Sequence, residues 1–179
     1  MQIAKKINRD LRRISEAVFG PSILSYYRYT FPIDLPKYSF FPNSPEHKGN
    51  FEHAVDIAVP NPRQMPLTIY APQSGIVRAG ILSNTMWGTK PTDKKFLNWI
   101  NIEVDDEEFY EIAHVAPLPD KILHVGDTVK MGDPILMTAL NGRVTTTNDV
   151  PDFHLHILVG KWIDRNKGEF ASLVIRWKR

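Results

Sequence analysis

The sequence predicts a mainly β protein with an antiparallel sandwich or barrel-like architecture. From residue 53 onward, short segments with partial alternation of apolar and polar residues are separated by turn sequences, among them Gln73-Ser74-Gly75, Gly126-Asp127, Gly132-Asp133-Pro134 and Asn141-Gly142. The clearest alternation puts Ile100, Ile102 and Val104 on one face of a strand. Asn101 and Glu103 fall on the other face. The spacing typical of βαβ units is absent, which favours antiparallel pairing.

The composition is that of a folded domain. The chain has 179 residues, of which 42% are hydrophobic and 23% charged, so it can form a packed core. The net charge is only +2 and both signs are mixed along the chain, which argues against a nucleic-acid binder. The chain has no cysteine. A metal ion would therefore be held by His, Asp or Glu, and thiol chemistry is excluded.

The first 46 residues are expected to be a helix and a connector that pack on a domain formed by residues 47–179. Apolar residues at helical spacing predict an amphipathic helix over residues 3–18, namely Ile3, Ile7, Leu11, Ile14 and Val18. The opposite face is basic, and we favour packing on the domain over contact with an anionic membrane surface. Residues 21–46 are rich in proline and aromatic side chains, and we expect them to wrap against the β domain without regular structure.

The sharpest local motif is the pair His154 and His156 in an apolar strand-like segment. Residues two apart in a strand point to the same face, so both imidazoles project together while Leu155 and Ile157 face the core. Two imidazoles on one face need hydrogen-bond partners or a metal. By itself the motif is equally compatible with two exposed histidines on an edge strand.

A second motif surrounds Asp56, which lies between Val55 and Ile57 and so points away from them. A partly buried acid needs a partner, and a divalent cation bound by His, Asp and His would supply one. Such a set matches the open catalytic type of zinc site, with three protein ligands and a water. A third histidine in a strand-like run, His114, completes the candidate site.

In chain order these motifs resemble the M23 family of zinc metallopeptidases, the lysostaphin- and LytM-like endopeptidases that cut peptidoglycan cross-bridges. The similarity covers roughly residues 47–160 and is carried by five segments: AVDIAVP, IYAPQSGIVRAG, EFYEIAHV, ILHVGDTVKMGDPIL and FHLHILV. The resemblance implies zinc, bound by Asp56 and His156, with His114 and His154 as catalytic histidines that do not bind the metal. It also implies a peptide or peptidoglycan substrate.

The remaining zinc ligand is where the chain departs from the family pattern. The family has a histidine four residues before the aspartate, and here Glu52 occupies that position. His47 resembles a variant in which the ligand comes from an earlier loop. His53 lies three residues before Asp56, where strand geometry points it to the opposite face. We therefore favour His47, followed by His53 and then Glu52.

Two more departures leave the substrate open. The family's frequent tyrosine two residues before the first catalytic histidine is missing, and residues 141–152 lack the usual glycine-rich approach to the His-x-His strand. Two other features are not assigned to the site: His124 is expected to be structural or at the surface, and residues 105–108 are expected to form a solvated hairpin turn.

Two alternatives to the peptidase remain open. One is a degenerate M23 domain that binds a partner without cleaving it. The other is a biotinyl/lipoyl-like module, for which Lys130 is the nearest candidate for modification. No apolar run approaches the roughly 20 residues that span a membrane, and no signal peptide is evident at the start of the sequence. The chain is accordingly expected to be cytoplasmic unless it is released by lysis or carried by a phage particle.

Overall fold

The computed structural model describes residues 23–33, 39–41, 47–58, 66–144, 146–147, 150–151 and 154–178. The helix expected over residues 3–18 lies outside them. Among the described residues, no helix has the length and apolar character needed to cross a membrane.

Strands make up most of the described fold. In chain order they are β1 (Leu24–Tyr29), β2 (Ser39–Phe41), β3 (Val55–Ala58), β4 (Thr68–Tyr70), β5 (Gly75–Ile81), β6 (Trp87–Gly88), β7 (Trp99–Glu103), β8 (Glu108–Ala113), β9 (Val115–Ala116), β10 (Thr128–Val129), β11 (Pro134–Thr138), β12 (Gly142–Arg143), β13 (Thr146–Thr147), β14 (Val150–Pro151), β15 (His154–Asp164) and β16 (Glu169–Trp177). Two short 3-10 helices, η1 (Gly49–Phe51) and η3 (Pro91–Phe96), lie between them.

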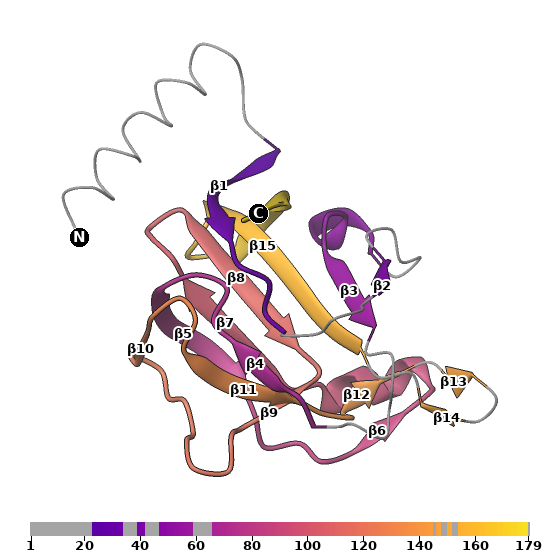
Figure 1. The fold of residues 1–179 in the computed structure, drawn as a ribbon. Coiled ribbons are helices and arrows are strands. Elements are labelled where there is room, and N and C mark those ends of the chain that lie inside the picture. Colours follow the sequence, from indigo (N-terminus) through magenta and orange to yellow (C-terminus); the bar gives the residue numbers. More distant parts are fainter. Residues whose placement is uncertain are drawn as a thin grey trace.

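The long strand β15 organises the main sheet. One of its edges pairs with β8 over residues 156–161. Its other edge pairs first with β3 over residues 154–157 and then with β16 over residues 159–164. Figure 1 shows β15 running through the middle of the fold, with β8 on one side and β3 on the other. The sheet continues from β8 through β7 and β5 to β10, and all of these pairs are antiparallel.

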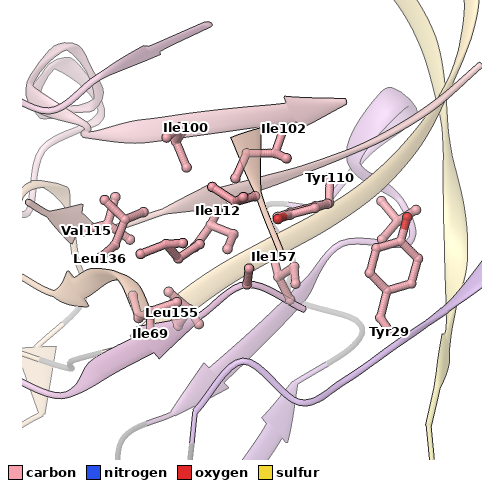
Figure 2. Packing of buried hydrophobic residues seen from close by; sticks show 14 of the residues in the cluster. Tyr29, Ile69, Ile100, Ile102, Tyr110, Ile112, Val115, Leu136, Leu155 and Ile157 are labelled. Carbon is pink, nitrogen blue, oxygen red and sulfur yellow. The ribbon is translucent and has the colours of Figure 1, made fainter. Parts of the chain in front are cut away.

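The core lies between the main sheet and a small sheet ordered β4-β11-β9. Figure 2 shows Ile69, Val115 and Leu136 of the small sheet gathered with the buried isoleucines and leucines of the main sheet. Nearly all of these side chains are fully buried, so the hydrophobic effect fixes which face of each strand points inward. The mainly β, antiparallel sandwich or barrel-like fold predicted from the sequence is confirmed.

The alternation predicted for the site strands is also observed. Leu155 and Ile157 of β15 lie in the core, as do Val55 and Ile57 of β3. The side chains between them point to the opposite face of the sheet. Because one face of β3 and β15 packs into the core, their other face, which is polar, lies outside the core.

The described part of the connector differs from the expectation of irregular structure. β1 pairs with β16 in parallel, and β2 pairs with β3. Tyr29, at the end of β1, is fully buried in the core, and Tyr27 and Phe31 pack against it. Several aromatic residues that we assigned to an irregular wrap are therefore strand residues, because the edges of β16 and β3 offer β1 and β2 backbone partners.

The expectation of a solvated hairpin turn at residues 105–108 is wrong for its last residue. Glu108 is fully buried, and its carboxylate accepts hydrogen bonds from the Tyr26 backbone N–H at 2.8 Å and the Tyr29 hydroxyl at 2.7 Å. These hydrogen bonds to Glu108 hold the β7–β8 hairpin against β1. His124 is exposed, as expected.

Candidate metal centre

Asp56 and His156 face each other across β3 and β15. The two residues form a register pair, so their side chains leave the sheet on the same face. His156 Nδ1 lies 2.9 Å from Asp56 Oδ1, and both side chains are less than one-fifth exposed. The strand pairing itself therefore builds this half of the site.

His47 reaches the same carboxylate from the loop before η1. Its Nε2 lies 3.2 Å from Asp56 Oδ1, and its side chain is only 4% exposed. The His47 and His156 rings are 5.0 Å apart at 76°. One potential ligand atom from each of the three residues lies within 4.8 Å of the others.

These atoms suit a zinc ion. Zinc binds histidine nitrogen and carboxylate oxygen at about 2.0–2.2 Å in tetrahedral geometry, which separates ligand atoms by about 3.3 Å. The two nitrogen–oxygen distances, 2.9 and 3.2 Å, are close to that spacing. The donor set of two imidazoles and one carboxylate is also that of an open catalytic zinc site. The residues therefore fit the metal.

The other two candidates for the remaining ligand lie elsewhere. Glu52 is exposed and His53 is half-buried, and neither belongs to the group of three. The backbone N–H of His53 donates to the Ser172 hydroxyl, which ties this turn to β16. The assignment of zinc ligands stays a prediction. The geometry nevertheless brings His47, the residue we favoured, together with Asp56 and His156.

The carboxylate and its imidazoles alter each other's protonation. Burial lowers the pKa of His47, although Asp56 opposes this effect. Burial would raise the pKa of Asp56, but its hydrogen bond with His156 and the nearby imidazole charges outweigh that effect and hold the pKa below its usual value. An ionised carboxylate beside a neutral His47 is the state in which ligands bind a cation without first losing protons.

His114 and His154 form a second imidazole pair. Their ring centroids are 4.2 Å apart at an interplanar angle of 57°. His114 is buried at the end of β8, whereas His154 at the start of β15 is half-buried. His114 has a φ of +61°, which is rare for a residue with a side chain. Because of this left-handed backbone conformation, the imidazole does not follow the regular alternation of side chains along β8.

The turn is held by backbone bonds and two buried asparagines. The His114 N–H donates to the Asn98 carbonyl at 3.0 Å, and the Ala139 N–H donates to the His114 carbonyl at 2.9 Å. The Asn141 side chain accepts from the Asn98 N–H at 2.8 Å. Side-chain amides of both asparagines donate to the Val115 carbonyl, at 3.0 and 2.9 Å. This network fixes the backbone on both sides of His114.

The network also sets the tautomer of His114. Its Nδ1 lies 2.9 Å from the Asn141 carbonyl oxygen, which can only accept a hydrogen bond. Nδ1 therefore carries the proton and Nε2 has a free lone pair. Burial, with a smaller effect from His154, lowers the pKa of His114 to about 3, so the ring is neutral at pH 7.

The sequence did not reveal these asparagines. Asn141 was assigned to a turn with Gly142, and Asn98 lies between apolar residues without any motif around it. Their importance depends on hydrogen bonds between residues 43 positions apart, which a single sequence does not encode locally.

Comparisons with known proteins identify the fold. No family model and no curated protein matches the sequence. Among solved structures, similarity extends to a zinc-containing peptidase from Vibrio cholerae (TM-score 0.50, 20% identity, 83% of this chain and 40% of that one). It also extends to a protein from Ruminococcus gnavus named as a LytM glycyl-glycine endopeptidase (0.56, 20%, 85% and 59%). A third, from Pseudomonas aeruginosa, is named as an M23 peptidase (0.52, 22%, 95% and 59%).

This chain thus spans only 40–59% of the length of these three proteins. The shared region nevertheless includes most of the chain described above. The resemblance that the motifs carried is confirmed at the level of architecture: the chain has the fold of the M23 zinc metallopeptidases.

Proposed function

We propose that this chain is a zinc-dependent endopeptidase that hydrolyses peptide bonds, in peptidoglycan cross-bridges or a related peptide. One observation carries the proposal: His47 and His156 both approach a single carboxylate oxygen of Asp56, beside a second imidazole pair. The names of two structural neighbours, a zinc-containing peptidase and a glycyl-glycine endopeptidase, support the same reaction.

His47 Nε2, the Asp56 carboxylate and His156 Nδ1 would hold the metal. A bound zinc ion supplies a Lewis acid for the peptide carbonyl and lowers the pKa of its water to about 7. Asp56 also keeps the centre less positive, because its carboxylate is ionised over the whole range in which imidazole ligands are neutral.

His114 and His154 would handle protons. His114 has its lone pair on Nε2, so it accepts a hydrogen bond from the attacking water and orients it. The fixed tautomer prevents Nε2 from acting as a donor. The donor role falls to His154, which would take up the proton that the attacking water loses, stabilise the carbonyl oxygen as negative charge develops, and pass the proton to the leaving amine.

Metal analysis and digestion of purified peptidoglycan test the proposal together. We expect about one zinc per chain and release of new amino termini from the cross-bridges, both removed by a chelator and restored by zinc. Zinc without hydrolysis of peptidoglycan or of model peptides would indicate a degenerate binding domain. Protein that neither contains nor takes up zinc would contradict the proposal and favour a carrier-like module.

A further inference from the structure

A carboxyl group and an amide lie on the site face of the sheet, one step along the strands from the metal centre. Glu111 of β8 is in register with Asn101 of β7 on one side and with Leu158 of β15 on the other. Residues in direct register share a face, and His156 pairs with Ala113, two residues from Glu111. Two residues along a strand span about 7 Å. Glu111 therefore points to the same face as His156, at about that offset.

Among the described residues, neither polar group finds the partners that its burial calls for. Asn101 is 6% exposed, and its Oδ1 is buried without a hydrogen-bond partner among the described residues. Glu111 is half-buried and makes no hydrogen bond or ion pair within that part of the chain. Its neighbours Leu158 and Phe109 are apolar and buried. Burial raises the pKa of the Glu111 carboxyl, although the charge of His156 opposes this effect.

A comparison with Glu108, three residues earlier on the same strand, shows what Glu111 lacks. Glu108 is fully buried, yet it accepts hydrogen bonds from β1 that compensate its desolvation. Glu111 finds no such compensation within the described part of the chain. An unpartnered carboxyl beside a buried amide oxygen is costly to keep unless a ligand completes it.

We propose that Glu111 and Asn101 form a subsite that binds a primary ammonium group of the peptide substrate close to the scissile bond. Two acceptors with apolar walls match the three N–H donors and single positive charge of an ammonium group. An offset of about 7 Å corresponds to about two residues of extended peptide. The subsite rests on the proposed peptidase function, and it narrows the substrate to peptides with an amine near the cleaved bond.

The ammonium group has two sources, a free amino terminus or the side chain of a diamino acid. Two peptide pairs separate them. One pair is pentaglycine amide with a free or an acetylated amino terminus. The other is acetyl-Gly-Gly-Lys-Gly-Gly-amide with free or acetylated lysine. Each peptide is tested with zinc-loaded protein by kcat/KM and by the shift of the Glu111 carboxyl carbon in NMR titrations.

In at least one pair, we expect the charged peptide to be preferred by about tenfold or more, the scale of a hydrogen bond to a charged group. Adding the charged peptide should lower the pKa of the Glu111 carboxyl. Glu111→Gln removes the preference while the zinc content stays unchanged. Asn101→Ala weakens the preference in the same direction. Glu169→Gln, the same change at an exposed site, leaves it intact.

The outcomes separate this proposal from the peptidase assignment. Hydrolysis with zinc bound but no preference in either pair would refute the subsite alone, as would an unchanged preference in Glu111→Gln. Absence of zinc and hydrolysis would refute the enzyme, while the carboxyl shift would still report whether the charged peptides bind.

Discussion

The two histidine groups of this site are built differently. His47 and His156 meet at a carboxylate, and burial of that carboxylate is compensated by both imidazoles. His114 and His154 meet each other, and the nearest support is a network of neutral amides around His114. The first group therefore carries the negative charge that a cation needs. The second contains a buried imidazole that is held neutral and oriented. The contrast supports the proposed division between metal binding by the first group and proton transfer by the second.

Removing the carboxylate or its register partner should have the largest effect. Asp56→Ala and His156→Ala each delete one of the three proposed ligands, and the two remaining groups should not hold zinc tightly. We expect both variants to contain no zinc after purification and to lose hydrolysis. Elemental analysis and circular dichroism check the result against correctly folded protein. Stoichiometric zinc in either variant would place the metal elsewhere.

The second group should respond in the opposite way. His114→Ala and His154→Ala should keep about one zinc per chain, because neither ring belongs to the converging three. Hydrolysis should fall about 10²- to 10⁴-fold, the range for loss of a general acid or base. Zinc content and kcat are measured on the same preparation. Loss of zinc from His114→Ala would show that the two groups have exchanged roles.

The loop ligand gives a smaller and sharper test. His47→Ala should weaken zinc affinity at least about tenfold, the lower limit even for groups that only support a ligand. His53→Ala, six residues later, should leave the affinity nearly unchanged. Competition with a zinc chelator gives both constants. A larger loss in His53→Ala than in His47→Ala would contradict the ligand assignment while leaving the two groups distinct.

The amide network offers the smallest change. Asn98→Ala deletes three side-chain hydrogen bonds, two with the Asn84 backbone and a buried one to the Val115 carbonyl, and should reduce the free energy of unfolding by about 1–3 kcal/mol. Water reaching the ring should raise the pKa of His114 from about 3 toward its usual value. Zinc content should not change. NMR titration of the His114 ring protons measures the shift, and an unchanged pKa would show that the network does not control the ring.

The difference between the groups also explains how far the sequence could be interpreted. Asp56, His154 and His156 were placed on one face by strand alternation, because the core fixes the opposite face. His47 was proposed from a resemblance, since no periodicity positions a loop residue. Asn98 and Asn141 were missed because their hydrogen bonds around His114 join residues far apart along the chain. The strands β1 and β2 were missed because proline and aromatic composition outweighed weak alternation.

His47, Asp56 and His156 are proposed to hold zinc, whereas His114 and His154 are proposed not to bind it. A crystal structure of protein purified without chelator, with anomalous data on both sides of the zinc absorption edge, tests this assignment most directly. We expect one zinc peak with His47 Nε2, an Asp56 carboxylate oxygen and His156 Nδ1 at about 2.0–2.2 Å. His114 and His154 should lie outside bonding distance. A zinc peak bonded to His114 or His53, or no peak after zinc soaking, would contradict the account.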